Sequence, residues 1–225
     1  MSLSAFNKTS LLNWYPSTID ISRQPNQNLA IAHLNIRSIK NKIDYIANSN
    51  LILFDMLIFT ESFLKEDFPD SLLDIDGFKF IRKDRAGSKP GGGIIFYYKS
   101  NISVSVIEDK NLSEAESLWV EIFNQKSKSS IIISAIYRPP SGNIRLFTDS
   151  LIDTIDTFNR NSTIVCLGDF NINFLEDSYS SNLLKSAINH LEFSVLNKFP
   201  TRVTDNSESL IDLILTNKPD NFFNT

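Results

Sequence analysis

Short apolar runs recur along the chain, and most of them have the length and composition of β-strands. Leu29–Ala32 leads into His33–Ile36, and strand alternation places His33 and Asn35 on one face. Phe54–Thr60 predicts a buried strand with Glu61 at its end. The other predicted strands are a hairpin of Phe78–Ile81 and Ile94–Tyr98, then Ser103–Glu108, Leu118–Phe123, Ile131–Tyr137, Thr163–Leu167, Ser194–Leu196 and Leu210–Leu215.

Helical periodicity is confined to a few segments. A helix is expected over Lys40–Ala47, with Ser38 as its cap. Two apolar stripes at three- and four-residue spacing predict two amphipathic helices; they consist of Phe147, Leu151, Ile155 and Phe158, and of Leu183, Leu184, Ala187, Ile188 and Leu191. Many strands with few helices, and hairpins mixed with crossovers, favour an α/β fold of two packed sheets flanked by helices.

The length of 225 residues is that of one domain. Residues 1–28 are polar and aperiodic, so we interpret them as a flexible leader and residues 29–225 as the folded domain. The longest apolar stretch, Leu51–Phe59, contains Asp55 and is about half of the roughly 20 residues that a transmembrane helix needs. No membrane association is expected.

Composition narrows the classes of function. A net charge of −4 and a pI of about 5.2 give no basic footprint for a simple nucleic-acid-binding module. An enzyme that meets phosphate through a bound cation is still compatible with this charge. Cys166, the single cysteine, lies in the apolar run Thr163–Leu167 and should be a buried, inert thiol, which fits an intracellular setting.

Several polar residues stand where apolar strands end: Asn35, Glu61, Tyr137, Asp169 and Asn171. Each has an ordinary structural explanation when taken alone, such as a turn cap for Glu61 or a core aromatic for Tyr137. Together they match the needs of phosphodiester hydrolysis. Glu61 suits a cation, Asp169 suits a water molecule, and the amides and the phenol can donate hydrogen bonds.

Five motifs in this order resemble one known family; they are His33–Ser38, Phe59–Ser62, Ala135–Pro140, Leu167–Asn171 and Ser209–Ile214. The chain resembles the endonuclease/exonuclease/phosphatase superfamily, which has the DNase I-like fold, over Leu29 to about Asn217. Tyr137–Pro140, Pro200–Arg202 and the glycine run Gly91–Gly93 look most like the endonuclease domain of non-LTR retrotransposons. Sphingomyelinases, inositol-polyphosphate phosphatases and abasic-site nucleases look less similar.

The resemblance implies a four-layer α/β sandwich, a Mg²⁺ or Mn²⁺ cofactor, and nicking of one DNA strand to leave a primer for reverse transcription. A reverse transcriptase domain of the same polyprotein and a nuclear location would follow from that function. The implied roles are metal binding for Glu61 with Asn35 beside it, donation to phosphate for Tyr137 and Asn171, and action on water for Asp169. Asp212 would orient a catalytic histidine. Thr201 would line the DNA site, with Arg138 and Arg37 as further DNA contacts.

The family pattern ends in a Ser-Asp-His motif, and the chain ends at Thr225 without it. We therefore expect a domain cut short before this motif, with the last strands of one sheet missing and activity lowered by roughly 10²–10⁴-fold. Of the two histidines, His33 shares a predicted strand face with Asn35, although packing in the strand is its more common role. His190 follows a helical stripe and should lie at the surface.

Two alternatives are open. One is a phosphatase or phosphodiesterase of the same fold acting on a lipid or nucleotide. Basic residues near the predicted site favour a polyanionic strand instead; they are Arg37, Arg82, Lys83, Arg85, Lys89 and Arg138. The other is a catalytically dead remnant, which the missing motif and the acidic pI would fit.

Overall fold

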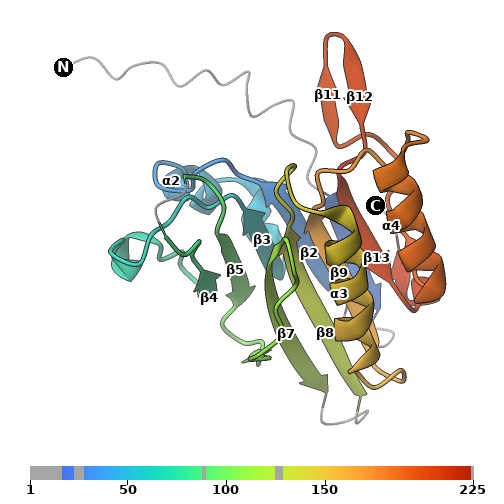
Figure 1. The fold of residues 1–225 in the computed structure, drawn as a ribbon. Helices are drawn as coiled ribbons and strands as arrows, with labels where there is room; N and C mark the ends of the chain where they lie inside the picture. Colours follow the sequence, from blue (N-terminus) through green and yellow to red (C-terminus); the bar gives the residue numbers. More distant parts are fainter. Residues whose placement is uncertain (1–16, 23–27, 88–89, 125–128, 224–225) are drawn as a thin grey trace.

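Two six-stranded sheets lie face to face in the computed structural model, which describes residues 17–22, 28–87, 90–124 and 129–223 (Figure 1). The strands of the first sheet, in spatial order, are β14 (Phe222–Phe223), β1 (Ser17–Ser22), β2 (Asn28–Asn35), β3 (Met56–Thr60), β5 (Ile94–Lys99) and β4 (Phe78–Lys83). Those of the second are β10 (Ser194–Val195), β13 (Asp212–Thr216), β9 (Thr163–Asp169), β8 (Ser129–Tyr137), β7 (Glu116–Asn124) and β6 (Ser105–Val106).

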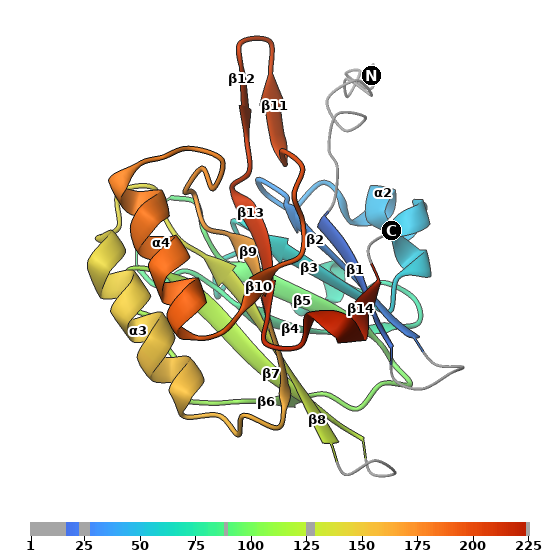
Figure 2. The same cartoon turned by 90° about the vertical axis from the view of Figure 1, so that its right-hand side faces the viewer.

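Apolar side chains fill the space between the sheets and cover both outer faces. Ile58 and Phe96 of the first sheet belong to the same buried cluster as Val120 and Leu167 of the second. Helices α3 (Ile144–Asp156) and α4 (Tyr179–His190) pack on the outer face of the second sheet, as Figure 2 shows. On the outer face of the first sheet lie the short helices α2 (Ile43–Ala47), η1 (Asn50–Leu53) and η2 (Asp70–Leu72). The predicted α/β sandwich of two sheets flanked by helices is confirmed.

Parallel pairing brings the ends of four strands to one edge of the sandwich, which we call the rim. Strands β2 and β3 are parallel, with Asn35 opposite Thr60, and β8 and β9 are parallel, with Tyr137 opposite Asp169. Strand β13 runs antiparallel to β9 and begins at this edge, so Asp212 lies opposite Asp169. The register of both sheets therefore gathers the polar strand ends that the sequence pattern singled out.

The predicted leader is wrong in part. Ser17–Ser22 forms β1, which pairs antiparallel with β2 and with β14, while residues 1–16 and 23–27 lie outside the described residues. β1 lies between β2 and β14, so backbone pairing on both sides holds this short polar segment in the sheet without a strong apolar signal. The expectation of a domain starting at Leu29 is corrected accordingly.

The helix predicted over Lys40–Ala47 is shorter than expected, and Ser38 does not cap it. Helix α2 covers only Ile43–Ala47, and its N-cap residue Lys42 makes no side-chain capping bond. Ser38 has a φ of 75°, and its backbone N–H donates to the carbonyl oxygen of Glu61. The segment after β2 is therefore a loop tied to the end of β3.

A two-stranded hairpin that the sequence pattern did not predict, β11 (Arg202–Thr204) with β12 (Ser207–Ser209), projects beyond the sheets (Figures 1 and 2). Cys166 is buried as expected, and burial raises the pKa of its thiol to about 12. His190 is exposed at the end of α4, also as expected. No helix among the described residues is long and apolar enough to span a membrane.

Candidate active site

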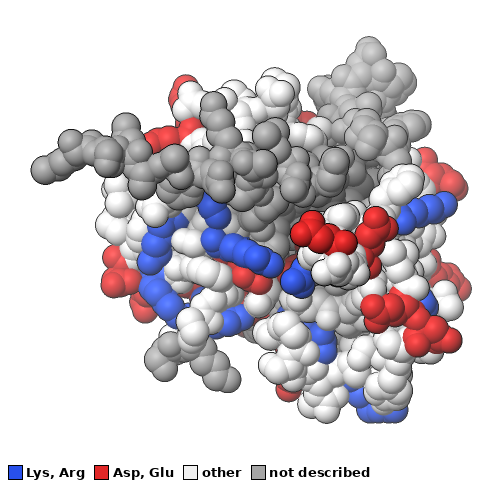
Figure 3. Space-filling model, turned by 90° about the horizontal axis from the view of Figure 1, so that it is seen from above, with Lys and Arg blue, Asp and Glu red and all other residues white. Residues whose placement is uncertain are grey.

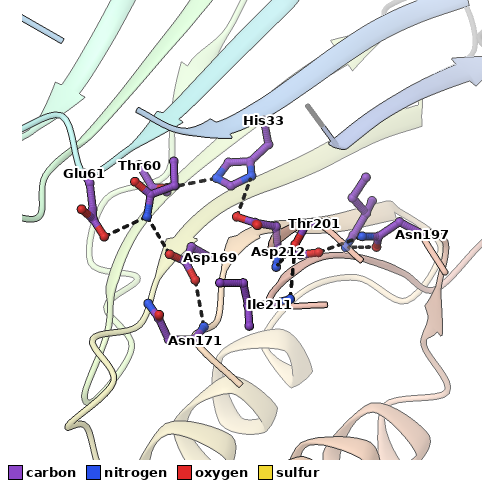
Figure 4. Close-up of polar contacts among 11 residues, drawn as sticks. His33, Thr60, Glu61, Asp169, Asn171, Asn197, Thr201, Ile211 and Asp212 are labelled. Atoms are coloured by element: carbon purple, nitrogen blue, oxygen red, sulfur yellow. Dashed lines mark hydrogen bonds and ion pairs between the residues drawn. The ribbon is translucent and has the colours of Figure 1, made fainter. Parts of the chain in front are cut away.

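One amide group joins the two sheets at the rim. The side-chain Nδ2 of Asn35 donates to Glu61 Oε1 at 2.8 Å and to Asp169 Oδ2 at 2.7 Å (Figure 4). Asn35 and Glu61 come from the first sheet and Asp169 from the second, 134 residues from Asn35 along the chain. Two carboxylates from different sheets are thus held within reach of a single ligand.

The backbone at the rim is held in a sparsely populated conformation. Glu61 and Asn171 have φ values of 54° and 49° and are not glycines. Such residues cost about 1–3 kcal/mol each and persist where the surroundings determine them, which is most frequent at functional sites. Here Ser62 N–H donates to the carbonyl oxygen of Gly93, and the Asn171 side chain donates to the carbonyl oxygen of Arg138. These bonds aim both side chains at the rim.

Asp169 is almost fully buried, with 2% of its surface exposed. Its Oδ1 accepts the backbone N–H of Asn171 at 2.9 Å, and its Oδ2 accepts Asn35 Nδ2. Burial raises the pKa of Asp169, while the hydrogen bonds from Asn35 and Asn171 oppose that rise. A carboxyl group whose pKa is raised toward neutrality is suited to exchange a proton with water.

Tyr137 stays protonated at neutral pH, because burial and then the negative charge of Glu61 raise its pKa to about 12. Its hydroxyl group is therefore a hydrogen-bond donor. Tyr137 is 7% exposed, at the end of β8 opposite Asp169. This fits the predicted role of a donor to a phosphate oxygen, which remains a prediction.

Asp212 lies beside Asp169, and the side chains of Thr201 and Asn197 bind its backbone. Its backbone N–H donates to Thr201 Oγ1 at 3.1 Å, and its carbonyl oxygen accepts Asn197 Nδ2 at 2.7 Å. Burial and then the charge of Asp169 raise the pKa of Asp212. Thr201 thus anchors the start of β13, and its predicted contact with DNA is a separate proposal.

His33 lies in the same cluster rather than merely packing in its strand. Its Nε2 is 3.1 Å from Thr60 Oγ1 and its Nδ1 is 3.7 Å from Asp212 Oδ1 (Figure 4). The side chain is 1% exposed, and burial lowers its pKa to about 3, so His33 is neutral at physiological pH. A neutral, buried ring therefore lies beside the Asp212 carboxylate.

The donor set at the rim fits a hard divalent cation. Asn35 Oδ1 is buried and has no hydrogen-bond partner among the described residues, while Nδ2 of the same amide faces the Glu61 carboxylate. Magnesium prefers such oxygen ligands and is commonly held by one or two carboxylates together with the substrate's phosphate. No cluster of three or more His, Cys, Asp or Glu suited to a metal occurs among the described residues.

The structure corrects the DNA-contact role predicted for Arg138. Its side chain is 3% exposed, and its guanidinium donates to the carbonyl oxygens of Gly142 and Phe170. A buried guanidinium in this position braces the loops after β8 and β9. Arg37 is exposed beside the rim, and its contact with DNA remains a prediction. Lys89 lies outside the described residues.

Charge is unevenly spread around the rim. Seen from above in Figure 3, Lys and Arg side chains gather mainly on the left half, the side on which α2, β4 and β5 lie in Figure 1. The chain as a whole is acidic, with a net charge of −4. A local basic side next to buried carboxylates is compatible with an anionic substrate that approaches a cation.

Two residues at the rim were not identified as a pair from the sequence. Arg85 lies with its guanidinium carbon 5.4 Å from the ring centroid of Tyr137, and Glu116 forms an ion pair with Arg85. Glu116 is also the register partner of Tyr137 across β7 and β8. The glycine run Gly91–Gly93 indicates that another group approaches the backbone closely. The sequence spacing does not identify Arg85 as that group.

Comparisons with known proteins support the fold. A family model described as "Endonuclease-reverse transcriptase" matches residues 131–224, a stretch that contains Tyr137, Asp169, Asn171 and Asp212. No curated protein matches the chain at a significant level.

Solved structures with the same fold include nucleases and a phosphatase. The endonuclease domain of TRAS1, a telomere-specific non-LTR retrotransposon, has a TM-score of 0.65 at 14% identity, with 82% of each chain covered. An AP endonuclease from Leishmania major has a TM-score of 0.67 at 12% identity, covering 97% of this chain and 88% of the other. A mannosyl-6-phosphatase from Bacteroides thetaiotaomicron has a TM-score of 0.59 at 16% identity, covering 84% and 85%. The chain therefore shares the DNase I-like fold of these nucleases and of the phosphatase, as the resemblance implied.

Proposed function

We propose that this chain is a divalent-metal-dependent phosphodiesterase that nicks DNA, with Asn35, Glu61 and Asp169 at its centre. The observation that carries the proposal is the Asn35 amide that joins a carboxylate of each sheet at 2.8 and 2.7 Å. In the retrotransposon setting, the nick would supply the primer for reverse transcription. The family model that joins an endonuclease to a reverse transcriptase supports this setting. Such an activity would be needed where chromosomal DNA is, in the nucleus.

The side chains at the rim divide the chemistry among them. Glu61 and Asn35 Oδ1 would hold Mg²⁺ or Mn²⁺, which when bound neutralises charge on the phosphoryl group. Asp169 orients the attacking water and accepts its proton, because its pKa is raised toward neutrality while both oxygens are fixed by Asn35 and Asn171. The protonated Tyr137 hydroxyl donates to a phosphoryl oxygen as negative charge grows there.

A long substrate is favoured over a small phosphomonoester by the surface next to the rim. The β11–β12 hairpin stands out from the sheets directly after Thr201, which itself bonds the backbone of Asp212. At its base Phe199 is 84% exposed, and Arg202 is exposed on β11. An exposed aromatic ring and a guanidinium can contact bases and phosphates of a strand that extends beyond the reacting bond.

The test is nicking of supercoiled plasmid with Mg²⁺, with Mg²⁺ plus chelator, and by the Asp169→Asn variant. Asp156→Asn, which changes an exposed carboxylate on α3 that pairs with Arg160, is the matched control. We expect the wild-type chain and the control to nick only with metal, and Asp169→Asn to lose at least roughly 100-fold. Nicking that survives either the chelator or Asp169→Asn would overturn the proposal. Hydrolysis of mannose 6-phosphate without nicking would identify a phosphatase.

A further inference from the structure

The glycine run Gly91–Gly93 has no part in the chemistry above, yet it lies against the site. All three glycines have positive φ values, between 70° and 85°. A Cβ on Gly92 would stand 2.2 Å from Arg85 Nε, and one on Gly93 would stand 2.5 Å from Ser62 Oγ. The absence of side chains therefore makes room for Arg85 on one side and for the loop that carries Glu61 on the other.

The backbone of the same run ties these two neighbours together. Ser62 N–H donates to the carbonyl oxygen of Gly93 at 3.0 Å, and Phe63 N–H donates to that of Gly92 at 2.9 Å. The Gly93 N–H donates to Glu116 Oε2, while Arg85 Nε donates to Glu116 Oε1. One carboxylate of the second sheet thus holds both the glycine run and the guanidinium.

The guanidinium is fixed on three sides. Besides Glu116, Arg85 Nη1 donates to the carbonyl oxygen of Pro90 at 2.9 Å, and the guanidinium carbon lies 5.4 Å from the ring centroid of Tyr137. The side chains of Arg85 and Glu116 are only 17% and 18% exposed. A cation held over an aromatic face stabilises the ring position, more strongly where both groups are shielded from water.

We propose that Arg85 and Glu116 form a positioning pair that fixes the Tyr137 ring at the rim, and that Gly91–Gly93 leave room for this pair and bind it through their backbone. The inference rests on the proposed function, in which Tyr137 donates to the phosphoryl oxygen. In this proposal Arg85 and Glu116 act without contacting the substrate. Their effect on the rate is transmitted through the position of the Tyr137 hydroxyl group and of the Glu61 loop.

The kinetic test compares Arg85→Met with Lys99→Met in Mg²⁺-dependent nicking. Lys99 also forms a partly buried ion pair, with Asp55, but at the opposite end of β3 from Glu61. We expect Arg85→Met to lower kcat by roughly 10- to 100-fold with KM nearly unchanged, Arg85→Lys to restore part of that loss, and Lys99→Met to behave as wild type. An unchanged kcat in Arg85→Met overturns the proposal.

A double variant separates positioning from direct contact. If Arg85 acts through Tyr137, then Arg85→Met should have at most a roughly twofold effect in a Tyr137→Phe background. Loss by the same factor in both backgrounds would mean that Arg85 works independently of Tyr137, and the positioning role would be wrong.

An NMR measurement tests the positioning role independently of the proposed function. In protein with ¹³C-labelled tyrosine, the Tyr137 ring resonance is identified by its absence in Tyr137→Phe. We expect this resonance to shift in Arg85→Met and in Glu116→Gln and to stay in place in Lys99→Met, whether or not the chain nicks DNA. A resonance unchanged in both variants of the pair overturns the positioning role, while absent nicking with a shifted resonance overturns only the nuclease.

Discussion

Asp169 and Asp212 lie opposite each other on neighbouring strands β9 and β13, and both are held at the buried rim of the sandwich. Burial raises the pKa of both carboxyl groups. The negative charges of Asp169 and Glu61 raise the pKa of Asp212 further. The folded state therefore binds protons here more tightly than the unfolded chain does. Ionisation of this pair at neutral pH opposes folding, which is the cost of keeping two acids in the site.

The first prediction is that Asp212→Asn stabilises the metal-free protein at pH 8. Removing one of two buried like charges should raise the free energy of unfolding by about 1–2 kcal/mol and the melting temperature by roughly 3–6 °C. Because the pKa is raised in the fold, this gain should shrink as the pH falls and the wild-type carboxyl becomes protonated. Thermal melts of both proteins at pH 8 and pH 5 measure it. A variant that melts below wild type at pH 8 would show that Asp212 stabilises the fold.

The second prediction concerns His33, whose pKa is shifted in the opposite sense. Burial lowers it to about 3, whereas in the unfolded chain it titrates near 6.5, so acidification below pH 6.5 favours unfolding. Between pH 6.5 and pH 5, this one group should cost about 2 kcal/mol of stability. His33→Gln removes this protonation. The difference in the free energy of unfolding between wild type and His33→Gln should therefore shrink by about 2 kcal/mol between pH 6.5 and pH 5.

Urea unfolding at pH 7, 6 and 5 measures the His33 effect. His190→Gln is the control, because its side chain is exposed at the end of α4. A constant gap between wild type and His33→Gln across the three pH values would contradict the neutral, buried state of His33.

The strand ends of the site were predictable because each combines an apolar run with a polar residue at its close. Glu61 follows Met56–Thr60, and Asp169 ends Thr163–Asp169, so burial of the run fixes where the carboxylate emerges. Parallel pairing then brings such ends to one edge. This much of the rim follows from local pattern together with strand direction.

The parts that could not be predicted depend on contacts between distant segments. Ser38 has the residue type of a helix cap, but its N–H is taken by the carbonyl oxygen of Glu61, and the helix starts later. Arg138 has the residue type of a phosphate contact, but neighbouring carbonyl groups bind its guanidinium inside the protein. Arg85 and Glu116 are 31 residues apart, and nothing local pairs them. Side-chain chemistry was visible in the sequence, whereas the choice of partner was not.

The third prediction tests the metal ligands without any assay of activity. Mg²⁺ at about ten times its dissociation constant should stabilise the fold by roughly 1.4 kcal/mol, because it binds only the formed site. The corresponding rise in melting temperature, about 3–6 °C, should disappear in Glu61→Gln and persist in Asp156→Asn. Calorimetry with and without Mg²⁺ measures it. A full Mg²⁺ shift in Glu61→Gln would place the cation elsewhere.

The fourth prediction concerns Gly168, the residue before Asp169. Its φ is 153°, and a Cβ there would stand 1.8 Å from the carbonyl oxygen of Ile136 on the paired strand β8. The parallel pairing of β8 with β9 sets Tyr137 against Asp169, so the strand contact that excludes a side chain at Gly168 also aligns two site residues. Gly168→Ala should therefore destabilise the fold by at least roughly 3 kcal/mol, combining strained backbone with a clash that backbone atoms cannot relieve.

Gly77→Ala separates these two causes. Gly77 also has a positive φ, 79°, but a Cβ there would meet nothing within 4 Å, so the substitution should cost only the conformational strain, about 1 kcal/mol. Urea unfolding of both variants at pH 7 gives the comparison. If Gly168→Ala were no less stable than Gly77→Ala, β8 and β9 would have to separate freely at this point, and the alignment of Tyr137 with Asp169 would not depend on their close approach. A larger loss in Gly168→Ala would show that one glycine fixes the register on which the site is built.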